Sequence, residues 1–555
     1  MCAGARRNGS ARDYVRPVSE LEPGLGPEGP GAYRLLRWVL GGPVRRFLAG
    51  LQDPDAAQQE VLRGLLRGAA DTAFGREHGL AQVRTLADFR AAVPVRDHHA
   101  LLPWLDRVSA GEGRVLTREP VLQLLETSGT TGKPKHLPVT ASWAGRVQEA
   151  QALWTLGLLQ EEPGVSRGSV LSVVSRSQHA TSPGGIPIGN NTARIRQAQP
   201  WWLRSRYAVP LQVMGIADPV TRQYAWLRFA LSAKISSWTT ANPSMVLLLC
   251  RRLQEWSGPL GADLAAGTLR HGPAEVLTES ERAPLERMLR PGQPPEDWRP
   301  CRIWPLVSVN CWTQGPAAYF AARLPTALGG DVPIRDVGLR ASEGFFAFPM
   351  RTDDPGSVLW PGGHLLEFIG DDGVARWAWE LEQGEEVRMV VSTQAGLYRY
   401  DLADRITVVG RCGRTPVVRF VGKHGRYLNS MGEKVTEAQV SAAMDVAAGR
   451  TGTHPVGFCA RVRLGEVPVF EVAVEADGDI AGLLAVFDTA LAEQNVEYAG
   501  KRSSGRLGSP VATYMAQGSF ARYREQRARD GASEGQVKDP ILALDEATWI
   551  RLVGG

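Results

Sequence analysis

A run of hydroxyl, glycine and lysine residues from Thr127 to Lys135, TSGTTGKPK, has the composition of a loop that binds a polyanion. Glycines let several backbone N–H groups turn toward one point, and hydroxyl and ammonium groups donate strongly to a charged acceptor. The apolar run VLQLLE precedes the loop and predicts a buried strand. Because α/β proteins often bind phosphates in the loop after such a strand, this loop is a candidate phosphate site.

The spacing within the loop differs from that of a P-loop. Two residues separate Gly129 from Gly132, and Lys133 is followed by proline. A P-loop needs four residues between its glycines and a Ser or Thr after its lysine. An ordinary kinase or GTPase is therefore disfavoured, and a mobile surface turn is the alternative interpretation of the composition alone.

The composition predicts a soluble globular protein with two or more domains. The chain has 555 residues, of which 43% are apolar and 22% charged. Its formal charge of +5 is small, and the basic residues are dispersed, so nucleic acid is not expected as a partner. The six cysteines are widely spaced without a C-x-x-C pair, and no H-E-x-x-H is present. A disulfide framework and a zinc site are therefore not expected. The reducing cytoplasm is the expected location of the protein.

Membrane association is not expected either. No stretch approaches the roughly eighteen consecutive apolar residues of a membrane span, and the N-terminus has no apolar signal region. Residues 1–33 are rich in Gly, Pro and Glu and predict a disordered leader. The basic segment 33–51 is interpreted as two ordinary helices interrupted at Gly41, Gly42 and Pro43, in preference to a membrane-surface helix.

The pattern of apolar residues predicts α/β architecture. Residues 55–105 have the three- and four-residue spacing of helices, whereas the runs SVLSVVS, VLWPGGHLLEFI and EVRMVVST are typical of strands. Beyond a boundary at Gly410 and Arg411, a hairpin over 461–476 and a helix over 482–499 predict a small α+β domain.

Tryptophan is concentrated in the middle of the chain: ten of the sixteen lie between Trp143 and Trp312. Large aromatic side chains there could line a pocket for an aromatic or apolar acid. Core packing is the favoured interpretation, because aromatic side chains dominate the burial of apolar surface.

Four segments, in order, resemble motifs of the auxin-responsive acyl-acid amido synthetases, adenylate-forming ligases that join auxin, jasmonate or benzoates to amino acids. They are TSGTTGKPKHLPVT, GLRASEGFF, GLYRYDLADRITVVG and RFVGKHGRYLNSMGEKVTE. Further segments in family order, among them TAFGREHGL, NVEYA and GQVKDP, extend the resemblance over most of the chain. Two departures occur: Ala403 stands where a glycine commonly precedes the motif's aspartate, and Leu339 and Arg340 replace the usual aromatic-Ala pair.

The resemblance implies an α/β fold with two domains. Residues 34–410 would form a large N-terminal adenylate-forming domain, with mixed sheets, helices and a small β-barrel-like region. Residues 411–555 would form a small, mobile α+β domain. The implied activity uses ATP and Mg²⁺ to convert a carboxylic acid into an acyl-AMP, releases pyrophosphate, and transfers the acyl group to an amine or amino acid. An acyl-CoA or carrier-protein ligase and a catalytically silent nucleotide-binding scaffold remain alternatives.

The resemblance also implies roles for single residues. The phosphate loop is expected to bind the nucleotide through Thr127, Ser128, Gly129, Thr130, Thr131, Gly132 and Lys133. Thr130 is also expected to be catalytic. Lys133 or Lys135 is expected to supply the cation. In the second motif, Ser342 and Glu343 are expected at the nucleotide. A carboxylate repels phosphate unless a metal intervenes, so Glu343 is the candidate Mg²⁺ ligand.

The third motif implies that Asp404 accepts hydrogen bonds from the ribose hydroxyls and that Tyr398 contacts the nucleotide. Asp401 is a competing carboxylate, and an arginine partner could explain either aspartate structurally. Lys434 is expected to bring a cation to the phosphates from the small domain, where it would stabilise the charge that grows in the transition state. Lys538, in GQVKDP, is a second candidate of this kind. No general base for the amine step can be named from the sequence.

Overall fold

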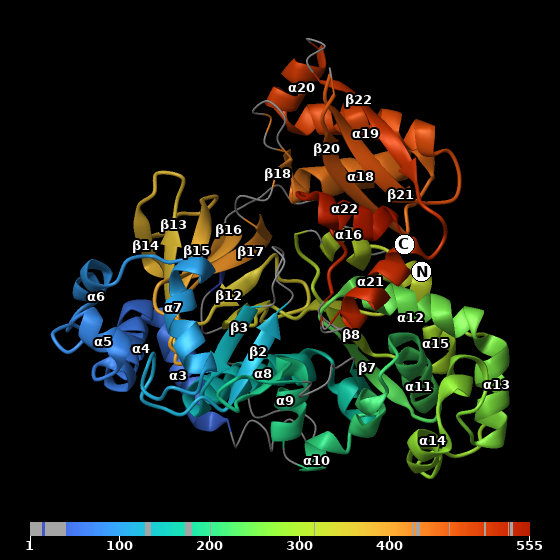
Figure 1. Ribbon diagram of the computed structural model, residues 1–555, viewed down its shortest axis with the longest axis horizontal. Coiled ribbons are helices and arrows are strands. Elements are labelled where there is room, and N and C mark those ends of the chain that lie inside the picture. The colour runs from blue at the N-terminus through green and yellow to red at the C-terminus, as the bar shows by residue number, and fades with distance from the viewer. Residues whose placement is uncertain are drawn as a thin grey trace. The chain divides into compact units, whose positions relative to one another are not determined.

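The structure is a computed structural model, and it divides into two compact units that are described separately. Unit 1 comprises residues 1–122, 138–161 and 338–420, and unit 2 comprises 123–137, 162–337 and 421–555. Figure 1 labels the helices and strands. The structure describes residues 14–16, 40–127, 135–172, 180–199, 201–315, 317–423, 427–428, 433, 435–465, 467–503, 507–530, 532 and 537–554.

Unit 1 is built on one large sheet in which the central strands β13, β15 and β16 pair antiparallel. The strands follow the order β10 (Leu339–Ala341), β11 (Gly344–Phe348), β12 (Ser357–Leu359), β17 (Thr415–Lys423), β16 (Tyr400–Cys412), β15 (Glu386–Ser392), β13 (Leu365–Ile369) and β14 (Ala375–Trp377). The apolar run VLWPGGHLLEFI thus forms two strands, because the sequence Trp-Pro-Gly-Gly-His turns the chain between β12 and β13.

The N-terminal region contributes a strand to this sheet. β1 (Tyr14–Arg16) pairs parallel with β16, with Tyr14 opposite Gly410. The predicted disordered leader therefore includes a short strand, and its other residues lie outside those that the structure describes. Gly410 and Arg411 lie within β16, so the predicted domain boundary falls inside a strand, and the division at this point stays a prediction.

The helices expected between residues 55 and 105 are confirmed. They are α4 (Pro54–Ala69), α5 (Ala73–Glu77), α6 (Leu86–Ala92) and α7 (His98–Ser109). α4 begins where the Asp53 carboxylate accepts from the Ala56 N–H, and Pro54 occupies the first turn, which needs no donor. The Gly-Gly-Pro sequence interpreted above as an interruption instead forms the first turn of α3 (Gly41–Gln52), for the same reason.

Unit 2 contains a parallel sheet in the order β4 (Ser169–Ser172), β7 (Ile235–Thr239), β8 (Ser308–Cys311) and β9 (Ile334–Asp336). Helices such as α11 (Pro219–Leu231) and α12 (Pro243–Glu255) separate these strands in the chain, as parallel strands require. A second sheet has the order β3 (Lys135–Val139), β2 (Gln123–Thr127), β6 (Pro187–Gly189) and β5 (Ala180–Thr181).

The core beside the parallel sheet confirms packing as the role of several central tryptophans. Trp226, Trp238 and Trp304 are buried there. The rings of Trp238 and Trp304 meet edge to face with centroids 5.9 Å apart, and the Trp304 indole N–H donates to the Ala230 carbonyl at 3.1 Å. Trp201, in contrast, is exposed.

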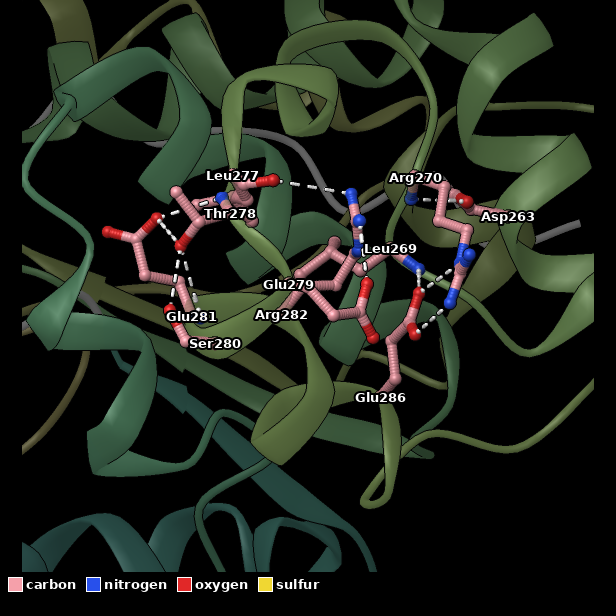
Figure 2. A network of polar contacts seen from close by, with 10 residues as sticks. All are labelled: Asp263, Leu269, Arg270, Leu277, Thr278, Glu279, Ser280, Glu281, Arg282 and Glu286. Carbon is pink, nitrogen blue, oxygen red and sulfur yellow. Dashed lines mark hydrogen bonds and ion pairs between the residues drawn. The ribbon is translucent and has the colours of Figure 1, made fainter.

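A polar network supports the helices of unit 2 on one side of this core (Figure 2). Arg270 makes a bidentate ion pair with Glu286 at 2.9 Å for both bonds, and its backbone N–H donates to the Asp263 carboxylate at 2.8 Å. Asp263 is fully buried and also accepts from the Tyr224 hydroxyl at 2.7 Å. Since the buried carboxylate is satisfied by hydrogen bonds, the network is structural.

The C-terminal region of unit 2 is a small α+β arrangement, as the sequence predicts. β20 (Gly457–Arg463) and β21 (Val469–Glu475) form the expected hairpin, and β22 (Gly508–Tyr514) joins β21 in parallel. The helices are α18 (Glu437–Thr451), α19 (Ile480–Gln494), α20 (Val496–Ser503), α21 (Ser519–Arg529) and α22 (Glu546–Val553). The single helix predicted over 482–499 is therefore two, because the chain leaves helical geometry at Asn495.

Within the described ranges, no helix is long and apolar enough to cross a bilayer. The cysteines described there, Cys250, Cys301, Cys311, Cys412 and Cys459, carry free thiols.

Candidate active site

The predicted phosphate loop begins at the end of a strand, as its sequence indicates. β2 ends at Thr127 and is paired in parallel with β6, and β3 begins at Lys135. The strand before the loop is thus confirmed. The side chain of Thr127 and the residues Ser128, Gly129, Thr130, Thr131, Gly132 and Lys133 lie outside the stretches that the structure describes, so their nucleotide-binding role stays a prediction.

Ser342 and Glu343 form the tip of the hairpin between β10 and β11 in unit 1. Gly344, which begins β11, is required by close packing: a Cβ there would lie 2.5 Å from Nε2 of His364. The backbone of Glu343 is held by Trp143, whose indole N–H donates to the Glu343 carbonyl at 2.7 Å. The Glu343 side chain is half-buried.

Tyr400, which no sequence pattern singled out, lies within reach of the negative charge of Glu343. Its side chain is 2% exposed. Burial, and then the negative charges of Glu343, Asp401 and Asp97, raise the pKa of the Tyr400 phenol, so the hydroxyl keeps its proton. The available sequence signal was the position of Tyr400 in the same segment as Asp404.

Tyr398 lies in the core, although the sequence predicts a nucleotide contact. Its hydroxyl donates to the Leu116 carbonyl at 2.6 Å, and its ring stacks on Phe74 with centroids 4.8 Å apart. Burial raises the pKa of this phenol as well. The hydroxyl is thus used inside the protein, which does not fit the predicted role. Tyr398 lies before β16 begins at Tyr400, and Arg399 between them has φ of +47°, so the regular alternation of a strand does not extend to Tyr398.

Asp401 and Asp404 have different surroundings in β16. Asp401 forms an ion pair with Arg388, with 3.3 Å between Oδ2 and Nε, and its Oδ1 accepts from the Ala403 N–H at 2.8 Å. Asp404 is 5% exposed. The arginine ion pair of Asp401 supports a structural role for that residue and leaves Asp404 as the candidate for ribose binding.

A bulge shapes this stretch of β16. Arg388 lies opposite Arg405 whereas Val390 lies opposite Asp401, so three residues of β16 face one residue of β15. Ala403 has φ of +55°, in the left-handed region that favours glycine. This conformation explains why a glycine is common at the position. Bulges re-aim neighbouring side chains, and Asp404 is one of the residues within this bulge.

The two lysine candidates belong to unit 2. Lys434 lies outside the described residues, but its neighbours are described: the Glu433 carbonyl accepts from Asn495 Nδ2 at 2.9 Å, and Val435 is in β19 (Val435–Thr436). The side chain of Lys538 is exposed, and its Nζ lies 4.5 Å from the centroid of the Trp312 ring.

The loop that carries Lys538 is fixed on both sides of the lysine. The Val537 carbonyl accepts from Asn242 Nδ2 at 3.0 Å, and Asp539 accepts from Arg524 at 2.5 Å. Trp312 directly follows β8, so Lys538 is held at the carboxyl end of the parallel sheet, the edge where open α/β sheets bind ligands.

The donor chemistry of Glu343 fits Mg²⁺. Among the described residues, no three His, Cys, Asp or Glu side chains gather in a group that could hold a metal. Mg²⁺ does not require such a group, because it commonly binds one or two carboxylates together with substrate phosphates and water. Glu343 offers a half-buried carboxylate at a hairpin tip, which is suited to this mode.

Comparisons with known proteins give the family. The chain matches three domains of the GH3 family: the N-terminal domain over residues 44–334, the central domain over 357–423 and the C-terminal domain over 438–547. The chain belongs to the GH3 family.

Named relatives and solved structures match over most of the chain. The indole-3-acetic acid-amido synthetase GH3.8 of Oryza sativa subsp. indica is 25% identical over 536 residues, covering 88% of each chain. The jasmonoyl-L-amino acid synthetase JAR4 of Nicotiana attenuata is 24% identical over 542 residues, covering 90% of this chain and 92% of its own.

Among solved structures, the GH3.15 acyl acid amido synthetase aligns with a TM-score of 0.81 at 19% identity, over 90% of this chain and 94% of that one. A 2-hydroxyisobutyryl-CoA ligase in its postadenylation state aligns with a TM-score of 0.52 at 14% identity, over 90% and 91%. The fold is therefore α/β with a large N-terminal domain and a smaller C-terminal domain, as the sequence predicts.

Proposed function

We propose that this protein is an ATP-dependent acyl-acid amido synthetase that acts in the cytoplasm. It activates a carboxylic acid as an acyl-AMP, releases pyrophosphate, and transfers the acyl group to an amine or amino acid. One observation carries the proposal: relatives named as amido synthetases match about nine tenths of the chain, and the match extends through all three GH3 domains. The free thiols in the described ranges support the cytoplasmic location.

The reaction needs charge neutralisation and positioning. A carboxylate resists attack by an amine because it is negatively charged and its oxygen is a poor leaving group. ATP supplies the adenylyl group, and Mg²⁺ neutralises its phosphates. In our proposal Asp404 binds the ribose hydroxyls, Glu343 provides the Mg²⁺ ligand, the loop from Thr127 to Lys133 surrounds the phosphates, and Lys434 and Lys538 supply cations.

Two other functions are less well supported. An acyl-CoA or carrier-protein ligase would share the first half-reaction, and the 2-hydroxyisobutyryl-CoA ligase shares the fold. Relatives that cover about nine tenths of the chain are named as amide-forming enzymes, which favours the amine as acceptor. A silent scaffold would be expected to have lost residues such as Glu343, Asp404 or Lys434, and the sequence retains them.

The products test the proposal directly. The full-length protein would be incubated with ATP, Mg²⁺, a pool of aromatic and aliphatic carboxylic acids, and amino acids. We expect AMP and pyrophosphate in equal amounts, together with a new amide mass in the mass spectrum. A parallel reaction with coenzyme A in place of amino acids should give no thioester. ADP and orthophosphate as products, or a thioester in place of an amide, would contradict the proposal.

A further inference from the structure

Asn242 and Trp312 follow two neighbouring strands of the parallel sheet in unit 2, β7 and β8, at their carboxyl ends. Asn242 Oδ1 accepts from the Ser244 N–H at 3.0 Å and so caps α12, and the Trp312 N–H donates to the Ala241 carbonyl at 2.9 Å. Asn242 is 7% exposed. Both residues are therefore fixed at the edge where open α/β sheets bind ligands.

The other half of the Asn242 amide contacts the C-terminal region. Its Nδ2 donates to the Val537 carbonyl at 3.0 Å. Val537 is itself buried in an apolar cluster of the C-terminal region that includes Phe520 and Trp549. An asparagine side chain has both a donor and an acceptor, so this one residue can cap α12 and also hold the segment that carries Lys538.

The bond from Asn242 fixes the backbone on one side of Lys538, and Asp539 fixes it on the other. The Asp539 carboxylate is 8% exposed and accepts from Arg524 at 2.5 Å. The Lys538 Nζ lies 4.5 Å from the centroid of the Trp312 ring, a distance at which an ammonium group is attracted to an indole. These contacts give a long, exposed side chain a fixed backbone and a surface to lie against.

We propose that Asn242 is a positioning residue for Lys538, and that its hydrogen bond to Val537 places the lysine for acyl-AMP formation. The inference rests on the proposed function, because it takes Lys538 as one of the cations that act on the phosphates of ATP. Placement matters for such a cation, because a misplacement of about 1 Å can slow a reaction by about 10². The bond joins two regions of unit 2, so it can act only in a half-reaction in which these regions are in contact.

The first test measures the two half-reactions separately in the full-length protein. Asn242→Ser keeps an oxygen that can cap α12 and removes the donor to Val537. We expect it to slow acyl-AMP formation by about 10 to 10² in single-turnover mixing experiments. The loss should appear in the rate at saturating ATP more than in the affinity for ATP, because the cation acts on the transition state. Conversion of supplied acyl-AMP and amine to amide should keep the parent rate.

Tyr224→Phe is the control for the loss of one buried hydrogen bond. Its hydroxyl donates to Asp263 at 2.7 Å in the structural network of unit 2. Asn242→Ser and Tyr224→Phe should both lose thermal stability, but only Asn242→Ser should slow acyl-AMP formation. Asn242→Asp, which keeps the shape and the cap but exchanges the donor for an oxygen, should give the same selective loss. Equal slowing of both half-reactions in the Asn242 variants, or no slowing of either, would overturn the inference.

A double-mutant cycle tests whether Asn242 acts through Lys538. In a Lys538→Ala background, Asn242→Ser should slow acyl-AMP formation no further, whereas a full additional loss would overturn the inference. If Lys538→Ala forms acyl-AMP at the parent rate, the roles of both Lys538 and Asn242 are overturned. A parent protein that releases ADP in place of AMP and pyrophosphate would instead contradict the proposed function itself.

Discussion

At the scale of single residues, the surroundings of Asp401 and Asp404 separate their roles. Asp401 has a charged partner, Arg388, and a hydrogen bond to the Ala403 N–H within the bulge. Both contacts stabilise the local backbone. Asp404 is a buried carboxylate within the bulge, and its binding of the ribose stays a prediction from the resemblance of its motif.

We therefore expect Asp404→Ala to weaken ATP binding by about 1 to 3 kcal/mol, the usual effect of losing a charged hydrogen-bonding partner. Asp401→Ala should lower the melting temperature and change ATP affinity much less. Calorimetric titration of each folded variant with ATP gives the affinities, and Asp404→Asn is the isosteric control for packing. A larger loss of affinity in Asp401→Ala would show that the motif has been read in the wrong register.

Some features of single residues could be predicted from the sequence, and others could not. The position of Ala403 was identified from the family pattern, and its left-handed φ gives the physical reason for the usual glycine. The effect of the Glu343 charge on the Tyr400 phenol could not be predicted, because it joins segments 57 positions apart in the sequence. It depends on how a hairpin tip and a strand meet, which no spacing rule encodes.

At the scale of elements, the start of β13 depends on a buried polar cluster. His364 Nδ1 lies 2.8 Å from Gln394 Oε1, Gln394 Nε2 donates to the Gly363 carbonyl at 2.9 Å, and the His364 carbonyl accepts from Gln58 of α4 at 2.8 Å. Because an amide oxygen can only accept, Nδ1 carries the proton. The imidazole also lies against Gly344, which begins the strand after Glu343.

This cluster predicts a dependence of stability on pH. Burial, offset by the Gln394 hydrogen bond and assisted by Arg146, lowers the pKa of His364 to about 4 from 6.5. Between these values the unfolded chain binds a proton that the folded protein does not, so stability is present above pH 6.5 and is lost as the pH falls toward 4.

We expect His364 to contribute a loss of roughly 2 to 3 kcal/mol in the free energy of unfolding between about pH 7 and pH 4.5. Urea unfolding of the parent and of His364→Gln at both pH values isolates this contribution. The variant should show a smaller decrease than the parent. Identical decreases would mean that His364 is not held neutral in the folded protein.

Elements were predicted well where local pattern and tertiary packing agree. The run EVRMVVS forms β15 with those bounds, and the strand before the phosphate loop forms β2. Predictions of where helices break were wrong. The break at Asn495 arises because its side chain donates to Glu433 and Gln439 and accepts from the Tyr498 N–H, contacts that only the folded domain provides.

At the scale of the whole molecule, the units do not follow the chain order. Residues 162–334 of the GH3 N-terminal domain belong to the same unit as the C-terminal domain. Within unit 2 these two regions are joined by ion pairs between Arg252 and Glu525 and between Arg323 and Asp445, and Phe320 packs into the core of the C-terminal region. The sequence pattern predicted a domain boundary near residue 410. It could not predict that each unit is built from segments that are separate in the chain, because this arrangement depends on long-range contacts.

These contacts join the C-terminal region to residues 162–334 within unit 2. Under the proposed mechanism, Lys434 acts on the α-phosphate of ATP during adenylation. After pyrophosphate leaves, that charge no longer needs stabilisation, whereas the amine needs access to the acyl carbon. We therefore expect the two half-reactions to require different orientations of the small domain, as in other enzymes that close around successive substrates.

Lys434→Ala tests this expectation, because removal of the cation should affect one half-reaction selectively. We expect acyl-AMP formation to slow by about 10² to 10³, the scale for losing one preorganised donor to a transition state, while conversion of supplied acyl-AMP and amine to amide stays within about tenfold of the parent. Single-turnover mixing experiments on folded protein measure both rates. Arg323→Ala, which removes a contact between the two regions of unit 2 without removing the cation, is the control for docking. If Lys434→Ala and Arg323→Ala slow the two half-reactions in the same proportion, Lys434 supports the docking of the small domain, and its assignment to the phosphate is contradicted.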